Sequence, residues 1–200
     1  MASVSERLFL GIGFEESQCR DLQAQVKKVK INLDKAELGH IWVRPENYHV
    51  TLIFLGSVEP ERKEEVLQIL RAKTPEFASF ELALRGVNAF ESERQARAIY
   101  CGVQNKKDLR HIVDELRTSL GLSPNPEYTP HLTIARLRNP AHIRDVISPV
   151  KNRDFLKAAV TEIRLYKSTL GGPYPIYTVL ERFALRARGY RVGSLGVMDR

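Results

Sequence analysis

The pattern of apolar and polar positions predicts short strands and amphipathic helices. Residues 7–14 form a short run of large apolar side chains, which is typical of a buried strand. Apolar residues then recur at helical spacing from Glu15 to residue 29, and lysines follow near the negative end of the helix dipole. The clearest helix is 106–120, where one apolar stripe is followed directly by Gly121.

The other segments indicate an α+β fold. Residues 32–40 look irregular, Pro60 fits the first turn of a helix, and 140–147 can form a short helix. Strands are predicted at 41–44, 48–56, 80–87, 98–103, 131–136, 160–166 and 175–185. Too many strands follow one another without a helix between them for a doubly wound parallel sheet. The pattern therefore favours short helices lying on antiparallel sheets.

One four-residue pattern, His-apolar-Thr-apolar, occurs twice in strand-like sequence. The copies are His-Val-Thr-Leu at 49–52 and His-Leu-Thr-Ile at 131–134. Residues i and i+2 of a strand share a face, so each copy presents an imidazole beside a hydroxyl. The apolar residues, including Phe54 further along the first strand, are expected to point the other way. The two copies look like equivalent points in two halves of one fold.

Two imidazoles are suited to proton transfer near neutral pH, because one can be neutral while the other is protonated. We expect His49 and His131 to face each other across a cleft and to act as an acid/base pair on a phosphodiester. One would activate the nucleophile, and the other would protonate the leaving oxygen. The hydroxyls of Thr51 and Thr133 could bind the non-bridging phosphate oxygens. This arrangement requires no metal.

Other sites remain open alternatives. A metal site would lack obvious further ligands, because no His-x-x-x-His, cysteine pair or acidic cluster accompanies the motif histidines. A Ser/His/Asp or Cys/His nucleophile stays possible in principle, although no G-x-S-x-G elbow occurs and Cys19 and Cys101 have no distinguishing context. The remaining histidines, His40, His111 and His142, look incidental.

Bulk properties narrow the setting. The chain has 200 residues and a net charge of +7, which favours an anionic partner such as a nucleic acid or nucleotide. We expect one domain over 1–188 and a basic tail over 189–200. Isolated cysteines and the lack of a signal peptide or membrane span favour the cytoplasm, with no membrane association. Nothing in the sequence suggests more than a monomer.

At these motifs the sequence resembles the 2H phosphoesterase superfamily. More closely, it resembles the RNA 2′,3′-cyclic phosphodiesterase branch, also called 2′-5′ RNA ligase or LigT-like. The matching segments are 7–9, 42–56 and 130–136, together with the ending at 168–173. The resemblance extends over residues 7–185, which is nearly the whole chain.

The resemblance implies two pseudo-symmetric lobes, each an antiparallel sheet backed by helices, around a central cleft. It also implies that RNA 2′,3′-cyclic phosphate ends are opened to 2′-phosphates without metal or cofactor. His49 would protonate the departing 3′-oxygen, and His131 would be the base for the attacking water. Thr51 and Thr133 would hold the phosphate.

Further residues are candidates for substrate binding. Arg136, which ends the second motif, is a plausible phosphate partner. Phe9, Tyr48 and Tyr128 are candidates to stack on a base. Two other functions stay open: a related substrate or 2′-5′ RNA ligation by the same fold, and a non-catalytic RNA-binding module.

Overall fold

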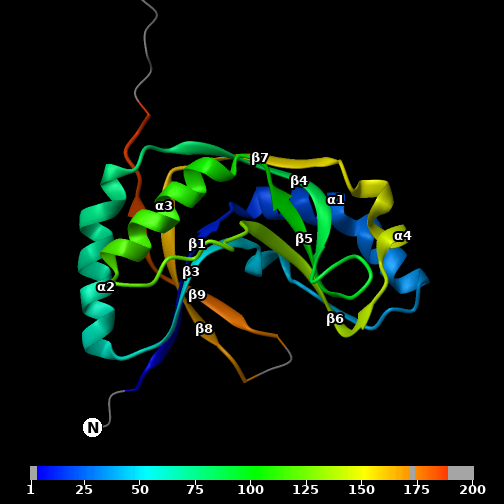
Figure 1. The fold of residues 1–200 in the computed structure, drawn as a ribbon, viewed down its shortest axis with the longest axis horizontal. Coiled ribbons are helices and arrows are strands. Elements are labelled where there is room, and N and C mark those ends of the chain that lie inside the picture. Colours follow the sequence, from blue (N-terminus) through cyan, green and yellow to red (C-terminus); the bar gives the residue numbers. More distant parts are fainter. Residues whose placement is uncertain (1–3, 172–173, 189–200) are drawn as a thin grey trace, which may run out of the picture.

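The computed structural model describes residues 4–171 and 174–188 (Figure 1). Its strands are β1 (Glu6–Gly13), β2 (His40–Trp42), β3 (His49–Val58), β4 (Phe80–Phe90), β5 (Ala96–Val103), β6 (His131–Ala141), β7 (Asp154–Val160), β8 (Glu162–Thr169) and β9 (Ile176–Ala184). Its helices are α1 (Glu16–Lys35), α2 (Pro60–Lys73), α3 (Lys106–Ser119) and α4 (Arg144–Ile147), with 3₁₀ turns at Pro45–Asn47, Thr74–Glu76 and Ser148–Val150.

The strands form one curled antiparallel sheet that consists of two lobes. Along the sheet the order is β7-β4-β5-β6-β3-β1-β8-β9, and β2 pairs with β6 beside this path. The lobes β7-β4-β5-β6 and β3-β1-β8-β9 are joined where β3 meets β6, through the single residue pair Val50 and Leu132. The predicted α+β fold with two antiparallel lobes is confirmed.

The helices hold the lobes together. α1 and α4 lie together at one end of the molecule, while α2 and α3 lie at the other (Figure 1). α1 follows β1 but packs on the opposite lobe, where the Gln25 side chain donates to the carbonyl of Phe155 at 2.7 Å and Asn32 donates to that of Val146 at 3.0 Å. α3 follows β5 but contacts β3. The buried apolar side chains of both lobes form one core.

Three local predictions differ from the structure. α1 continues to Lys35, through residues expected to be irregular. β6 runs on past Pro140, which is exposed near the strand end, where a missing N–H is tolerated. β7 was not predicted. It is an edge strand of the sheet. Its alternation of buried and exposed side chains depends on small alanines as well as on Phe155, so the apolar pattern in the sequence is weak.

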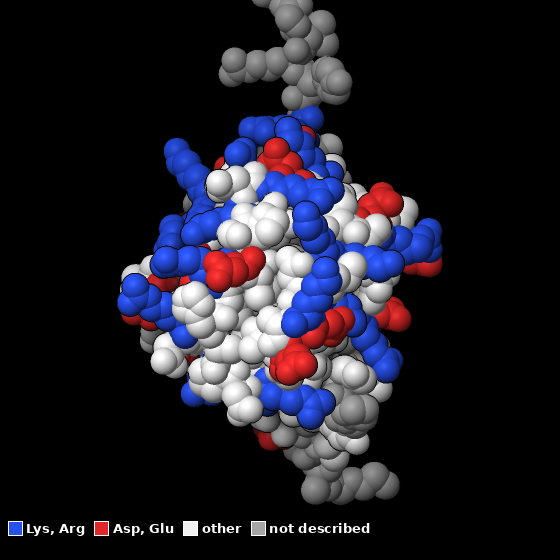
Figure 2. Space-filling model, turned by 90° about the vertical axis from the view of Figure 1, so that its right-hand side faces the viewer, with Lys and Arg blue, Asp and Glu red and all other residues white. Residues whose placement is uncertain are grey.

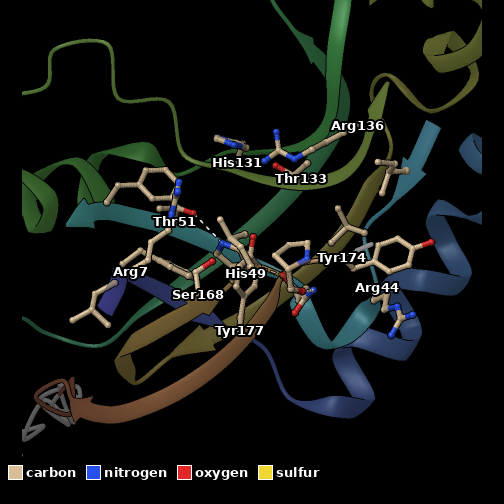
Figure 3. A pocket seen from close by; sticks show the side chains of 18 of the residues that line it. Arg7, Arg44, His49, Thr51, His131, Thr133, Arg136, Ser168, Tyr174 and Tyr177 are labelled. Atoms are coloured by element: carbon tan, nitrogen blue, oxygen red, sulfur yellow. Dashed lines mark hydrogen bonds between the residues drawn. The ribbon is translucent and has the colours of Figure 1, made fainter. Parts of the chain in front are cut away.

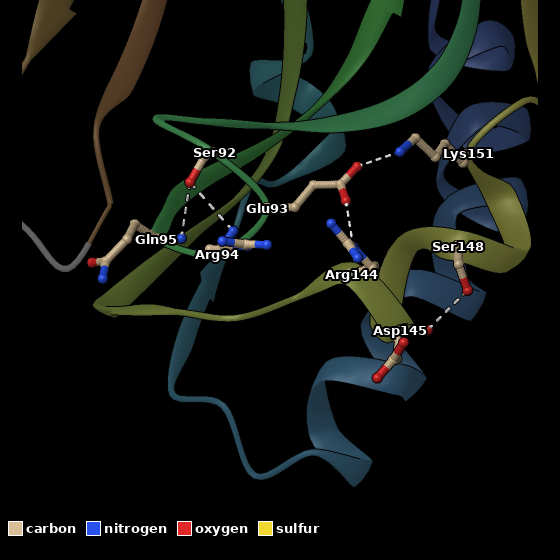
Figure 4. Close-up of polar contacts among 8 residues, drawn as sticks. All are labelled: Ser92, Glu93, Arg94, Gln95, Arg144, Asp145, Ser148 and Lys151. Carbon is tan, nitrogen blue, oxygen red and sulfur yellow. Dashed lines mark hydrogen bonds and ion pairs between the residues drawn. The ribbon is translucent and has the colours of Figure 1, made fainter.

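A charged cluster anchors the connection between β4 and β5 (Figure 4). The Glu93 carboxylate accepts hydrogen bonds from Lys151 and, at 3.3 Å, from Nε of Arg144 at the start of α4. The backbone N–H of Ile143 donates to the Glu93 carbonyl at 2.8 Å. These contacts hold in place the end of β4, where Phe90 is the last residue.

The surface shows no single basic patch on the face drawn in Figure 2. Lys and Arg side chains are spread over this face, and Asp and Glu lie among them. The net charge of +7 therefore does not by itself locate a binding site. Within residues 4–171 and 174–188, no helix is long and apolar enough to cross a membrane.

Two glycines with positive φ give a matched test of the fold. A Cβ on Gly86 (φ +72°) would lie 2.4 Å from the Lys151 carbonyl oxygen, whereas a Cβ on Gly121 (φ +68°) would meet nothing within 4 Å. We expect Gly121→Ala to cost about 1 kcal/mol of unfolding free energy from the backbone alone. Gly86→Ala should cost about 1–3 kcal/mol more because of the steric clash. Urea unfolding measures both, and equal losses would contradict the expected contact.

Candidate active site

The register between β3 and β6 brings the two motifs together. Val50 and Leu132, the second residues of the motifs, are paired and fully buried. Because the strands are antiparallel, one step along this register places His49 opposite Thr133 and Thr51 opposite His131. These four polar residues line one cavity of about 320 Å³. Figure 3 shows them converging from the two strands.

A β-bulge changes the side-chain alternation in β3 after the motif. Consecutive residues of β1 pair with Thr51 and Ile53, so that Leu52 is the extra residue on β3. Leu52 and Ile53 are both buried, although they are adjacent in the strand. Phe54 is thereby turned to the same face as Thr51, as bulges beside functional sites commonly do. It is 70% exposed and lines the cavity. The prediction that Phe54 points into the core is wrong, because strict alternation does not survive the bulge.

β6 repeats this irregularity at the equivalent place. Consecutive residues of β5 pair with Thr133 and Ala135, so that Ile134 is the extra residue on β6. Ile134 and Ala135 are both buried, although they are adjacent in the strand. Arg136, five residues after His131, is thereby exposed and lines the cavity. Arg136 and Phe54 occupy equivalent positions in the two lobes.

Backbone carbonyls fix the tautomer of both imidazoles. Nδ1 of His49 lies 2.7 Å from the carbonyl oxygen of Asn47, and Nδ1 of His131 lies 2.7 Å from that of Thr129. A carbonyl can only accept, so Nδ1 carries the proton and Nε2 remains to exchange protons. Nε2 of His49 lies 3.0 Å from Oγ1 of Thr51, which can donate to it.

Both imidazoles are packed among aromatic rings, which come from β1 and β9 at His49 and from β4 and β5 at His131. The centroid of the His49 ring lies 4.9 Å from that of Phe9 and 5.1 Å from that of Tyr177. The centroid of the His131 ring lies 4.6 Å from that of Phe90 and 5.2 Å from that of Tyr100. These rings restrict the orientation of the imidazoles. They also exclude water from them, which disfavours the charged form.

Burial therefore lowers the pKa of both histidines. It is the main cause at His49, whose pKa falls to about 4, and at His131. The positive charge of Arg136 lowers both pKa values further, while the hydrogen bonds to the backbone carbonyls oppose the shift. Both shifts favour the neutral imidazole at pH 7.

The cavity is rich in positive charge. Arg7, Arg44 and Arg136 line it, and no Asp or Glu does so among the described residues. Figure 3 shows Arg7 at one end of the cavity and Arg44 with Tyr174 at the other, on either side of His49. The Arg44 guanidinium lies 4.5 Å from the centroid of the Tyr174 ring. The sequence predicted Arg136 at this site. It did not predict the lining residues Arg7, Arg44, Ser168, Tyr174 and Tyr177.

The expected base-stacking residues are placed in supporting positions. Phe9 lines the cavity but is only 3% exposed, because it stacks on Tyr166 at 4.9 Å. Tyr48 is buried. Tyr128 is also buried and does not line this cavity, although it reaches a neighbouring hollow. Its hydroxyl donates to the Thr51 carbonyl at 3.1 Å. None of the three presents an open ring face to the motif histidines.

The rival chemistries have little structural support. Across the described part of the chain, no group of three or more His, Cys, Asp and Glu residues could hold a metal ion. Cys19 and Cys101 are buried, and burial raises the pKa of both thiols, which disfavours the reactive thiolate. Residues 189–200, expected to form a basic tail, lie outside the described residues.

Solved structures share this bilobal architecture. Escherichia coli LigT superposes with a TM-score of 0.72 at 25% identity, over 92% of this chain and 99% of LigT, and it has also been solved with 3′-AMP. A Thermus thermophilus protein superposes with a TM-score of 0.70 at 28% identity, over 92% of this chain and all of that protein.

Sequence comparison gives the family. The model of the 2′-5′ RNA ligase superfamily matches residues 18–172. An RNA 2′,3′-cyclic phosphodiesterase of Methanothermobacter thermautotrophicus is 30% identical over 90% of this chain and 98% of its own length. An RNA 2′,3′-cyclic phosphodiesterase of Thermotoga maritima is 32% identical over 87% of this chain and 92% of its own length. The chain belongs to the 2′-5′ RNA ligase superfamily, as the motifs predicted.

The protonation states can be measured by ¹⁵N NMR of the imidazoles. At pH 7 we expect both motif histidines to be neutral and protonated on Nδ1, and His49 to gain its second proton only near pH 4. Adding inorganic phosphate should raise both pKa values, because a bound anion stabilises the imidazolium. His49→Gln and His131→Gln variants assign the signals. A charged imidazole at pH 7 without phosphate would contradict this picture.

Proposed function

We propose that this chain is an RNA 2′,3′-cyclic phosphodiesterase that uses His49 and His131 as an acid/base pair without metal. The main support is the antiparallel pairing of the two motifs, which brings both histidines to one arginine-lined cavity. The names of the relatives and the 3′-AMP complex of LigT support the same substrate class.

In this mechanism water attacks the phosphorus of the cyclic phosphate. Nε2 of His131 takes a proton from the water as the new P–O bond forms. The bond between phosphorus and the 3′-oxygen breaks, and Nε2 of His49 donates a proton to that oxygen. The product is a 2′-phosphomonoester beside a free 3′-hydroxyl. The assignment of acid and base follows the family resemblance.

The substrate itself can establish the required protonation state. One of the two imidazoles must carry a second ring proton for the reaction, although burial favours the neutral form of both. A phosphodiester carries one negative charge, which raises the pKa of a nearby imidazole. Thr51, Thr133 and Arg136 can meanwhile bind the non-bridging oxygens and stabilise the charge that develops on them.

A second candidate is 2′-5′ RNA ligation by the same site. It is favoured by the cavity, which extends past His49 toward Arg7 in one direction and toward Arg44 in the other. A 5′-hydroxyl could then take the place of water as the nucleophile. A binding module without catalysis would instead predict salt-sensitive RNA binding that is indifferent to the chemistry of the end.

The direct test is turnover of a 2′,3′-cyclic nucleotide in the presence of EDTA. We expect full activity and a 2′-phosphate product. His49→Ala and His131→Ala should each lower kcat by about 10²–10⁴-fold, because each removes a proton-transfer group. Circular dichroism would check that the variants fold. Activity abolished by EDTA, a 3′-phosphate product or an unaffected histidine variant would each contradict part of the proposal.

Arg136 can be tested against Arg138, two residues further along the same strand. Both side chains are exposed, but only Arg136 lines the cavity. We expect Arg136→Ala to lower kcat/KM by about 10–100-fold, which corresponds to losing a charge-assisted hydrogen bond to phosphate. Arg138→Ala should leave kcat/KM within about 2-fold of the wild-type value. Equal effects would argue for a general role of surface charge.

A further inference from the structure

Arg164 is the one charged side chain that is buried in the described part of the chain, where it is 8% exposed. It lies on β8 between Ile163 and Leu165, which face the core, so its side chain leaves from the opposite face of the sheet. It does not line the cavity of the motif histidines, so contact with substrate does not explain it. Taking a charge out of water is costly even when the charge is paired, and stability alone is a weak reason to bury this one.

Ion pairs fix the position of the Arg164 guanidinium. Its Nε donates to Oε1 of Glu162 at 2.6 Å, and its Nη2 donates to Oε1 of Glu15 at 3.3 Å. Glu162 is held in turn by Arg182, and Glu15 belongs to the capping box at the start of α1. The remaining nitrogen, Nη1, lies against Gly13 of β1. The guanidinium is therefore anchored on one side and directed at β1 on the other.

The absence of a side chain at Gly13 gives Arg164 and Tyr166 their place over β1. A Cβ at this position would overlap both Nη1 of Arg164 and the hydroxyl of Tyr166. These two groups thus share one small space, where they interact with each other. Gly13 is also the residue that pairs with His49 on the neighbouring strand β3. The contact between Arg164 and Tyr166 consequently lies one strand away from a motif histidine.

The ring of Tyr166 carries this contact to the imidazole of His49. It stacks on Phe9 with an interplanar angle of 8° at a centroid distance of 4.9 Å, and its centroid lies 5.9 Å from that of His49. Phe9 is itself 4.9 Å from His49. The hydrogen bond from Nδ1 to the Asn47 carbonyl holds one atom of the imidazole and leaves its plane free to turn. The direction of Nε2 therefore depends on these rings.

This support has no counterpart at the other motif histidine. His131 packs on Phe90 and Tyr100, which come from β4 and β5. Arg164 is the only buried charged side chain among the described residues, and it belongs to the lobe of His49. The two imidazoles are thus held by different means, and His131 provides an internal control for any change at Arg164.

We propose that Arg164 is a positioning residue for His49: through the hydroxyl of Tyr166 it holds the ring stack that directs Nε2 of His49 toward the departing oxygen. The consequence for catalysis rests on the proposed phosphodiesterase function, whereas the orientation of the imidazole does not. Because Arg164 does not touch the substrate, its loss should lower kcat and leave KM unchanged.

The test is a double-mutant cycle between Arg164→Met and Tyr166→Phe with 2′,3′-cyclic AMP as substrate. Methionine leaves no carboxylate buried without a partner, because Glu162 keeps Arg182 and the side chain of Glu15 is 74% exposed. Each single variant should lower kcat by about 10–100-fold with KM within about 2-fold, as expected for a misplaced proton donor. The double variant should be no slower than the slower single variant, because Arg164 acts through the Tyr166 hydroxyl.

¹⁵N NMR of the imidazoles tests the positioning without turnover. In Arg164→Met, the fraction of neutral His49 that carries its proton on Nδ1 should fall, since the ring is free to leave the Asn47 carbonyl. The signals of His131 should not move. Arg182→Met is the matched control, because it breaks the other ion pair of the same carboxylate and leaves Arg164 in place. It should change neither kcat nor the spectrum.

The possible outcomes separate the inference from the proposed function. The inference is overturned if Arg164→Met keeps the wild-type kcat and the wild-type His49 spectrum, if the losses in the double variant multiply, or if Arg182→Met has the same effect as Arg164→Met. Should Arg164→Met fail to fold by circular dichroism, Tyr166→Phe decides alone, and a wild-type kcat there overturns the inference. If wild-type protein does not open 2′,3′-cyclic AMP, the phosphodiesterase function fails, and the His49 spectrum still decides the positioning.

Discussion

The structure depends on one short antiparallel contact between β3 and β6. Val50 and Leu132 are buried at this contact, and their register is what sets each motif histidine opposite the threonine of the other lobe. A slip of one residue would exchange the polar and apolar faces of the slipped strand. α1 and α3 each pack on the lobe they do not follow in the chain, so the helices also hold this contact in register.

The two motifs are nearly identical, and the site gains its asymmetry from the residues beyond them on each strand. After equivalent bulges, one strand presents Phe54 and the other presents Arg136. A pseudo-symmetric fold thus forms an asymmetric cavity, with an aromatic ring on one side of the paired motifs and a cation on the other. The surrounding rings differ as well, because His49 packs on Phe9 and Tyr177 while His131 packs on Phe90 and Tyr100.

The sequence predicted the fold class and the paired polar face, because both depend on local periodicity and a repeated motif. The bulges could not be predicted in this way. They depend on how β1 and β5 pair with the motif strands, so Phe54 was wrongly assigned to the core. Tyr128 illustrates the converse. Its aromatic character suggested stacking, but tertiary packing buries the ring and uses its hydroxyl to hold the backbone of Thr51.

Burial of the histidines links their protonation to the arrival of substrate. An exposed imidazole with a pKa near 6.5 would be partly charged at pH 7 whether or not the cleft is filled. Here burial and the charge of Arg136 lower the pKa of both imidazoles. In the proposed mechanism, the anionic phosphate therefore stabilises the proton on the acid. Arg136 therefore acts in two directions. Its charge disfavours the imidazolium, and in the proposed mechanism it also helps to bind the anion that stabilises the imidazolium. An acid/base pair built in this way takes its active charge state when a phosphate lies between the two Nε2 atoms.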